Sequence, residues 1–329
     1  MKLTNSNYQI IPSNGNTLEG IYKDIEIAAR TCYKSENKMT EDSATKFVDN
    51  LIKRKHYAML EFGTVYLTIA ADSNSEQFES DLKLIYELQQ NPYCKINFKS
   101  KNDNPVAYIT TNFRVVTEHP EWELLKYLTE PTEYHHKKLT VKFTTSIGIV
   151  REIIRHRVFS FANESTRYCN YNKSDDIEFI IPHWLDLPEG KFRVLGIGKY
   201  SINGIELNHD DGNDMDFIFN CMDAEYIYNG LIEDGLPPQD AREVLPLCTK
   251  SELMMCGFIE DWTDFLNKRT SIIAATGKPH PDLCKLTDKL YGELMSRDLL
   301  QNVCNEIILA NSKFYTCTNN DIEIIIYDC

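Results

Sequence analysis

A short segment in the middle of the chain combines residue types that bind anions. Residues 151–168 contain four arginines and a histidine, whereas the whole chain of 329 residues carries a formal net charge of -14. The sequence pI is about 5.1, so the segment is cationic in an acidic protein. Guanidinium groups bind phosphate through paired, charge-assisted hydrogen bonds. The segment therefore predicts a site for a small anionic ligand that carries phosphate.

Residues 163–168 add further polar groups to this segment. They supply amide, carboxylate, hydroxyl, guanidinium and phenol groups, a mixture that suits a ligand with a phosphate at one end and a polar heterocycle at the other. A simpler interpretation of the basic residues is that cations near the C-terminus of a helix interact favourably with its dipole, by about 0.3–1 kcal/mol each. That interpretation accounts for one or two of them and leaves the polar residues that follow unexplained.

Nucleophilic catalysis is another interpretation of the same residues. Ser165 lacks the Gly-x-Ser-x-Gly turn of the α/β-hydrolases, and no spacing assigns His156 as its base. Cys169 follows directly, and a buried, unreactive thiol is the commoner role for such a cysteine. We therefore expect the segment to bind a ligand rather than to attack one.

Composition limits the classes of partner. The net negative charge disfavours nucleic acids and anionic membranes as partners. No stretch approaches the roughly 20 apolar residues that span a bilayer, and residues 1–9 lack the apolar core of a signal peptide. The ten cysteines include no Cys-x-x-Cys pair, so we expect reduced thiols of a cytoplasmic protein and no metal site. His135-His136, the only adjacent histidine pair, lies in a polar stretch that we expect to be exposed.

Hydrophobic periodicity predicts both helices and strands. Helical spacing of apolar residues predicts helices at residues 18–33, 42–52, 73–91, 146–157, 216–235, 238–245, 260–274 and 281–312. Strands are predicted at residues 64–70, 138–144 and 177–181. Residues 188–214 are rich in Gly, Asn and Asp, and form the best candidate for an insertion or a flexible excursion. We expect an α+β fold with a single domain over residues 1–329.

A three-residue basic motif carries a resemblance to a known family. Arg155, His156 and Arg157, followed after seven residues by Ser165, match the signature of the flavin-dependent thymidylate synthases, and the match continues through residues 164–171. Other blocks resemble further segments of this family in the family's order. They lie at residues 28–36, 55–61, 238–246 and 262–271, with His280-Pro281 after the last. The chain therefore resembles this family along most of its length.

The resemblance implies an enzyme that converts dUMP to dTMP. In that family methylenetetrahydrofolate supplies the carbon, NADPH reduces a bound FAD, and the reduced flavin delivers hydride to the pyrimidine. The resemblance also implies a mixed α/β fold with an antiparallel sheet and long helices, in a homotetramer with active sites at subunit junctions. Nucleic acids, membranes and metals are not expected as partners.

The same resemblance implies roles for individual residues. Arg269 would polarise the uracil and favour ionisation at N3, which places a fixed cation where negative charge develops. The residues implied in dUMP binding are Glu152, Arg155, Asn163, Glu164, Ser165, Thr166, Arg167, Arg242 and Arg269. The residues implied in FAD binding are His56, Arg155, His156, Arg157 and Asn163. The Ser165 hydroxyl is expected to contact the nucleotide and not to act as a nucleophile.

The sequence departs from the family pattern on the flavin side. Three positions that contact flavin in many family members hold Phe258, Glu260 and Asp264, none of which keeps the expected side chain. Residues 272–279 are extra sequence, in which we expect a loop, because the Walker spacing that would make Gly277-Lys278 a phosphate loop is missing. The departures leave room for two alternatives: a flavin-dependent hydroxymethylase of pyrimidine nucleotides, and a non-catalytic nucleotide-binding protein.

Overall fold

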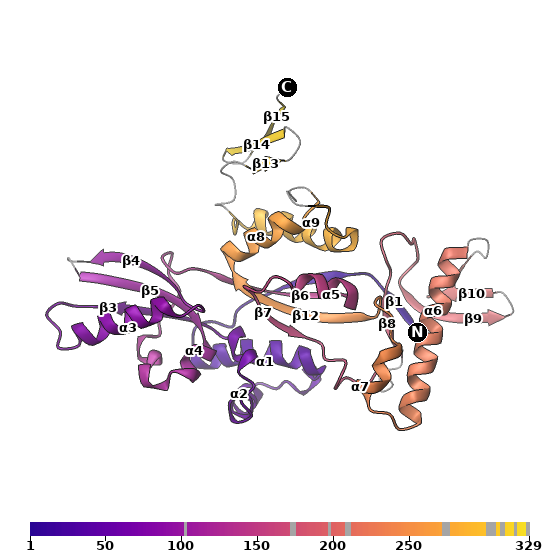
Figure 1. Cartoon of the computed structure of the whole chain (residues 1–329), viewed down its shortest axis with the longest axis horizontal. Helices are drawn as coiled ribbons and strands as arrows, with labels where there is room; N and C mark the ends of the chain where they lie inside the picture. Colours follow the sequence, from indigo (N-terminus) through magenta and orange to yellow (C-terminus); the bar gives the residue numbers. More distant parts are fainter. Residues whose placement is uncertain are drawn as a thin grey trace.

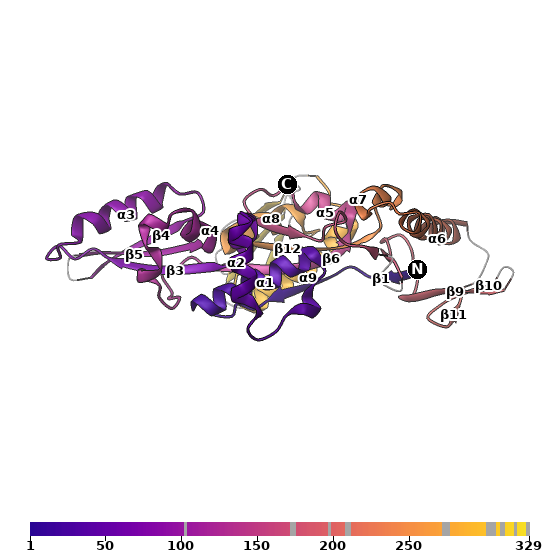
Figure 2. The same cartoon turned by 90° about the horizontal axis from the view of Figure 1, so that it is seen from below.

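The described part of the chain forms four sheets, three of which follow one another along the long axis (Figure 1 and Figure 2). In this computed structural model the described residues are 1–101, 104–171, 176–196, 199–207, 212–271 and 277–300. Three further strands, β13 (Ile307–Leu309), β14 (Lys313–Thr318) and β15 (Asp321–Ile326), form an antiparallel sheet of their own. Among the described helices, none combines the length and the apolar character needed to cross a membrane.

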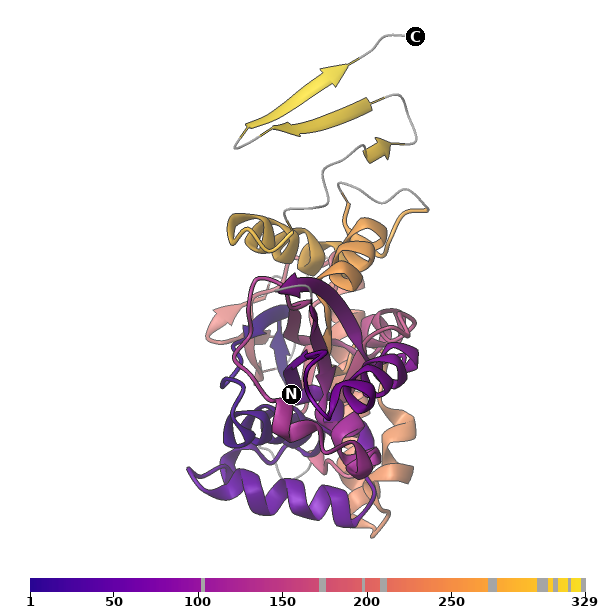
Figure 3. The ribbon, with the colours of Figure 1, turned by 90° about the vertical axis from the view of Figure 1, so that its left-hand side faces the viewer.

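The central sheet carries the basic motif. Its strands are β2 (Asn7–Ile11), β6 (Lys138–Ser146), β12 (Lys250–Phe258) and β7 (Ser160–Asn163), in that order and all antiparallel. Successive side chains of a strand point to opposite faces. Leu253 and Met255 of β12 therefore join the core below α8 (Ile259–Arg269) and α9 (Pro281–Ser296), while Met254 and Cys256 face α1 (Leu18–Tyr33). Figure 3 shows α8 and α9 above the sheet and α1 below it.

A second antiparallel sheet lies on one side of the central one. It contains β3 (Thr64–Ala70), β5 (Asn104–Asn112) and β4 (Lys95–Lys101). The helix α3 (Phe78–Gln90) packs on it through Leu84, Ile85 and Leu88. α2 (Ser43–Lys53) packs against α1, and α4 (Phe113–Glu118) begins where the Asn112 side chain accepts a hydrogen bond from Val115 N at 3.2 Å.

A five-stranded sheet lies on the opposite side (Figure 2). Its order is β11 (Ile205–Glu206), β10 (Lys199–Ile202), β9 (Gly190–Gly196), β1 (Lys2–Thr4) and β8 (Glu178–Ile180), with β1 and β8 parallel. The helices α6 (Gly212–Glu233) and α7 (Pro238–Ala241) complete this part. Phe192 and Ile202 are buried in its core, so the described part of residues 188–214 is folded into strands. That this segment is an insertion stays a prediction, as does the single domain.

The helix predicted at residues 146–157 is shorter than expected. It is α5 (Ile147–Ile153), and the three residues of the basic motif lie in the turns beyond it. The chain has to reverse there, because β7 begins at Ser160 and pairs antiparallel with β12. A second antiparallel partner of β12 is β6, which leads directly into α5.

Other predicted helices also end early. The helix predicted at residues 281–312 ends at Ser296, because Asp298 adopts a left-handed φ of 54°, and β13 follows. The helix predicted at 260–274 ends at Arg269, since Thr270 is extended, and residues 272–274 lie outside the described ones. α7 gives way to a 3-10 turn at Arg242–Val244. The predictions of a helix at 18–33 and a strand at 64–70 are confirmed.

The expectation that the histidine pair is exposed is wrong for His135. Its side chain is buried, and its Nε2 lies 3.1 Å from Leu67 O. Its Nδ1 accepts a hydrogen bond from Thr132 N at 3.0 Å. The polar residues around His135 suggested that its side chain is exposed. Two backbone groups, however, satisfy both ring nitrogens inside the protein.

Candidate active site

The basic motif lies where α5 and β7 meet the end of α1. Ser146 Oγ starts α5 by accepting a hydrogen bond from Ile149 N at 3.2 Å. β7 is an edge strand, and the loop after it docks on α1 because Ser165 N donates to Cys32 O at 2.9 Å. Segments that are distant in the sequence therefore meet at the motif.

A hollow of about 400 Å³, here called the Arg242 hollow, lies beside this junction. Arg151, Asn163, Glu164, Thr166 and Arg242 line it, and Leu245 and Leu247 give it an apolar wall. Glu243 also lines it, with its Oε1 3.6 Å from Arg242 Nε. Arg242 Nη1 donates to Thr166 Oγ1 at 3.0 Å, which fixes the direction of its guanidinium group. Two guanidinium groups beside an apolar wall can hold a phosphate and a flat polar ring at once. The structure thus brings four of the predicted nucleotide-binding residues, Asn163, Glu164, Thr166 and Arg242, into one hollow.

Glu164 is the most tightly held residue of this hollow. Its buried carboxylate forms an ion pair with Lys34 Nζ at 2.9 Å and accepts a hydrogen bond from Tyr171 OH at 2.6 Å. Its second oxygen, Oε2, is buried without a hydrogen-bond partner among the described residues. A buried acceptor without a donor is costly, so this oxygen is an unsatisfied polar atom beside the hollow. Burial and the Glu164 charge raise the pKa of Tyr171, which keeps its phenol protonated.

The other five predicted residues, Glu152, Arg155, Ser165, Arg167 and Arg269, do not line the Arg242 hollow. Ser165 is held through its backbone on α1. Arg155 and Arg167 are exposed, and the Arg167 guanidinium lies 5.5 Å from the centre of the exposed Tyr168 ring. Cys169 is buried as predicted, and burial raises the pKa of its thiol to about 11, with the Glu164 charge adding to the shift. The thiol is therefore protonated at neutral pH and unreactive.

Arg269 and His156 form a second cluster. Arg269 Nε donates to His156 Nε2 at 2.9 Å, and Arg269 Nη1 lies 3.7 Å from Glu152 Oε2. The imidazole packs edge-on against Phe265, with ring centres 4.8 Å apart. Burial first, and the Arg269 charge second, lower the pKa of His156 to about 4. His156 is therefore a neutral acceptor that orients Arg269 toward the motif.

Arg157 lines a different hollow, of about 240 Å³, here called the Arg157 hollow. Lys138, Asn112 and Glu61 also line it. Glu61 is neutralised there, since Arg114 Nη1 lies 2.7 Å from one of its oxygens and Ser160 Oγ donates to the other at 2.6 Å. The available charges are thus those of Arg157 and Lys138, a donor set that suits phosphate.

His56 lies in a third hollow, of about 400 Å³, here called the His56 hollow. Arg30, Lys38 and Arg54 also line it, and no carboxylate does. Within the described chain, therefore, the predicted flavin residues do not converge: His56, Arg157 and His156 lie in three separate places.

The three positions that depart from the family pattern are engaged with neighbouring side chains. Glu260 lies 2.7 Å from His136 Nδ1 and 3.2 Å from Lys95 Nζ, and the hydrogen bond from His136 is the main cause that lowers the pKa of Glu260 to about 2. Lys95 also lies 4.4 Å above the Phe258 ring. Asp264 pairs with Lys268 at 2.6 Å. Glu260 and Phe258 therefore belong to a cluster around Lys95 at the protein surface, and Asp264 forms an ion pair within α8.

Sequence reasoning missed several residues that line these hollows or hold their lining residues. Lys34 and Glu61 belong to blocks that resemble the family, so a signal existed, but only the folded contacts show what they touch. Tyr171 ends the extended match to the motif. Nothing in the sequence marked Lys138 as a site residue, because it is the first residue of a strand in which polar and apolar side chains alternate.

Comparison with known proteins gives consistent matches. The family model described as "Thymidylate synthase complementing protein" matches residues 101–280. A "Probable flavin-dependent thymidylate synthase" of Paramecium bursaria Chlorella virus 1 is 27% identical over 158 residues, which cover 46% of this chain and 65% of that protein. The flavin-dependent thymidylate synthase of Thermosipho melanesiensis is 26% identical over 161 residues, covering 47% of this chain and 65% of that protein. The chain thus spans slightly less than two thirds of these curated relatives.

Solved structures were compared as well. The UMP/dUMP methylase PolB from Streptomyces cacaoi, bound with 5-Br UMP, is 15% identical with a TM-score of 0.42, covering 92% of this chain and 95% of that one. The same protein bound with 5-Br dUMP is 16% identical, also with a TM-score of 0.42, covering 92% of this chain and 96% of that one.

We predict that His156 stays neutral until the pH falls to about 4, because burial and the charge of Arg269 disfavour its protonation. An unfolded histidine titrates near 6.5, so the unfolded state binds more protons between these values. The stabilisation that His156 contributes is then complete above pH about 6.5 and is lost as the pH falls toward 4. An NMR titration of the imidazole checks this, and Arg269→Gln should raise the midpoint. A wild-type midpoint near 6.5 would contradict the prediction.

Proposed function

Because the chain belongs to the family of thymidylate synthase complementing proteins, we propose that it is a flavin-dependent thymidylate synthase that makes dTMP from dUMP. The observation that carries the proposal is the Arg242 hollow. Its lining combines two arginines with the buried Glu164 carboxylate, one oxygen of which has no hydrogen-bond partner within the described part of the chain. A nucleoside monophosphate offers the complementary groups: a dianionic phosphate, a flat polar base and N–H donors.

In this proposal the Arg242 hollow binds dUMP. Arg151 and Arg242 bind the phosphate, because both guanidinium groups line the hollow and Thr166 orients that of Arg242. Glu164 Oε2 accepts a hydrogen bond from the nucleotide and so gains the donor it lacks. Asn163, the last residue of β7, adds a polar contact from the lining of the hollow. The Ser165 hydroxyl, which lies outside that lining, is proposed to reach the nucleotide from the loop that follows β7.

Arg269 is the proposed catalytic residue. Its guanidinium polarises the pyrimidine where negative charge develops, and such fixed charges are worth more in a preorganised site than in water. His156 supports this role, because a neutral imidazole accepts the Arg269 N–H without adding a competing positive charge. Glu152 holds a second nitrogen of the same group at 3.7 Å. His156 is thus proposed as a positioning residue for Arg269, in addition to the flavin contact implied by the motif.

The chain also offers residues that fit a flavin nucleotide. A bound FAD would supply hydride for the pyrimidine after reduction by NADPH. Arg157 and Lys138 provide two cations in the Arg157 hollow for its phosphates, with Glu61 neutralised beside them. His56 lies in a hollow that carries three further cations. These groups replace the contacts that Phe258, Glu260 and Asp264 do not provide.

A homotetramer with shared active sites is part of the proposal. The motif exposes apolar surface, with Val158 65% and Tyr168 63% exposed, and its Arg155 and Arg167 point to solvent. Partner subunits that cover this surface would bring Arg155 to a nucleotide and a flavin, and would join hollows that are separate in one chain. Methylenetetrahydrofolate and NADPH are the proposed co-substrates, in the cytoplasm.

Product analysis tests the proposal. The purified chain should be yellow or bind added FAD, and dUMP should increase NADPH oxidation in the presence of methylenetetrahydrofolate. Mass spectrometry should then identify dTMP. A hydroxymethylated nucleotide would instead identify the related hydroxymethylase, and dUMP binding without any flavin would identify a non-catalytic nucleotide-binding protein. Either of these two results would overturn the proposed activity.

We expect Arg269→Ala to lower the rate of dTMP formation by roughly 100- to 1,000-fold, the usual effect of losing one donor that stabilises developing charge. FAD binding should be unchanged, because the substitution removes a proposed contact to the pyrimidine. Lys268→Ala is the matched control, since it removes the neighbouring cation, which pairs with Asp264 at the exposed side of α8. Near-normal turnover of the Arg269 variant would remove Arg269 from the mechanism.

We expect Arg157→Ala to weaken FAD binding by roughly tenfold to a hundredfold, the effect of losing a charged hydrogen bond of about 1.5–3 kcal/mol. Flavin fluorescence quenching during titration of the apoprotein measures this without reference to turnover. Lys138→Met should weaken binding in the same direction, whereas Arg193→Ala on the exposed side of β9 should leave it unchanged. Full cofactor affinity in the Arg157 variant would show that the hollow binds something else.

A further inference from the structure

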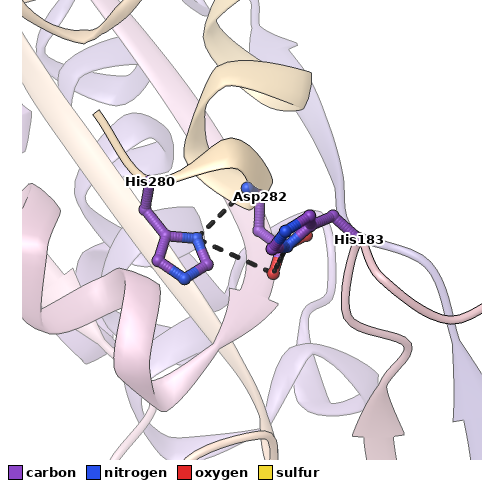
Figure 4. A group of neighbouring side chains, drawn as sticks. All are labelled: His183, His280 and Asp282. Atoms are coloured by element: carbon purple, nitrogen blue, oxygen red, sulfur yellow. Dashed lines mark hydrogen bonds and ion pairs between the residues drawn. The ribbon is translucent and has the colours of Figure 1, made fainter. Parts of the chain in front are cut away.

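Two histidines and an aspartate converge on the side of the molecule where α9 begins (Figure 4). His183 follows β8, His280 immediately precedes α9, and Asp282 lies in the first turn of that helix. One ligand atom from each lies within 4.8 Å of the others. Asp282 Oδ2 is 3.5 Å from His183 Nδ1 and 3.8 Å from His280 Nδ1, and the two rings stand at 89°.

The spacing of these atoms is wider than that of direct ion pairs. Charge-assisted hydrogen bonds between nitrogen and oxygen are typically about 2.7–2.9 Å long, whereas both histidines here remain well beyond that distance from the carboxylate. Three polar ligands thus surround a common centre without closing on one another.

The hydrogen bonding of His280 fixes its protonation. Its Nδ1 accepts a hydrogen bond from Asp282 N at 3.2 Å, so this nitrogen carries a lone pair and no proton. The same nitrogen also lies 3.8 Å from Asp282 Oδ2, which is another acceptor. Two acceptors that face each other are stabilised by a cation between them. An ion there would take over the lone pair, and water could satisfy the freed N–H at the helix start.

We propose that His183, His280 and Asp282 bind a divalent transition-metal ion of the zinc class, with water completing the coordination. Two imidazoles and one carboxylate form a common ligand set for such ions. Among the described residues, no lysine or arginine is paired with Asp282, so no side-chain cation competes for its carboxylate. The side chains of His183 and His280 are 33% and 42% exposed, which gives an ion access from solvent.

The site joins two parts of the fold. His183 leads from the five-stranded sheet, while α9 packs on the central core. α9 also holds the end of α8, because Thr287 Oγ1 donates to Arg269 O and Ser271 N donates to Asp288, at 2.6 and 2.8 Å. A bound ion would therefore fix the start of the helix on which the backbone of Arg269 rests. Its role is structural and does not depend on the proposed thymidylate synthesis.

Zinc titration of the full chain tests the site. After treatment with a chelator, the purified protein should bind one Zn²⁺ per chain in competition with a chromophoric chelator, and zinc should raise its melting temperature. His183→Gln and Asp282→Asn should each weaken binding by about tenfold or more, since losing even an outer-shell partner costs that much. His119→Gln is the matched control, because His119 also lies near a carboxylate, at 3.1 Å from Glu121, but has no second histidine.

Cobalt distinguishes this site from thiol ligands. Cys221 and Cys248 lie with their sulfurs 3.7 Å apart and are the competing metal-binding pair. Co²⁺ at the histidine–aspartate site should give visible absorption without an ultraviolet thiolate-to-metal band. A thiolate band, undiminished zinc binding in the double variant His183→Gln with Asp282→Asn, or the absence of stoichiometric zinc binding to the wild type would each overturn the proposal. Circular dichroism confirms that the variants are folded.

Discussion

The hydrogen bond from Arg269 to His156 ties together the two segments on which the site depends. It joins the last turn of α8 to the turn that follows α5. The bond requires an imidazole without a proton on Nε2, and the partly buried position of the ring against Phe265 provides that condition, since burial disfavours the charged form. The guanidinium is then held in one direction and keeps its full charge. Both helices are fixed on the same core, so the bond is a consequence of how β12 pairs with β6 and β7.

The sequence predicted the elements better than it predicted their ends. The helix at 18–33 and the strand at 64–70 follow from periodicity because each buries one face on a single core. The end of α5 did not follow, because Arg155 and His156 are compatible with a helix, and the chain leaves it only to let β7 pair with β12. Likewise, the left-handed backbone at Asp298 ends the predicted last helix, and an aspartate there gives little warning.

Individual contacts were still harder to foresee. The motif identified Glu164 as a site residue, but the pairing with Lys34 arises because the loop after β7 docks on the end of α1. The sequence likewise did not predict the cluster of His183, His280 and Asp282, because His183 is far from the other two along the chain and follows the edge strand of another sheet. His135 shows the opposite error: a polar neighbourhood suggested exposure, while backbone groups from elsewhere bury and satisfy the ring. Contacts of this kind depend on tertiary packing, which periodicity does not report.

The acidic net charge of the chain contrasts with the Arg157 and His56 hollows, whose linings carry more cations than carboxylates and therefore suit anionic ligands. A surface with net charge -14 repels nucleotides at long range, so binding has to come from close contacts in sheltered places. The two proposed sites differ in which residues supply these contacts. At the proposed nucleotide site, Asn163, Glu164 and Thr166 of the motif segment line the Arg242 hollow. At the positions where the family resemblance implied flavin contacts, Glu260 pairs with Lys95 and His136 instead. The proposed binding of a cofactor therefore relies on cations from other elements, such as Lys138 on β6, which lies outside the family motif.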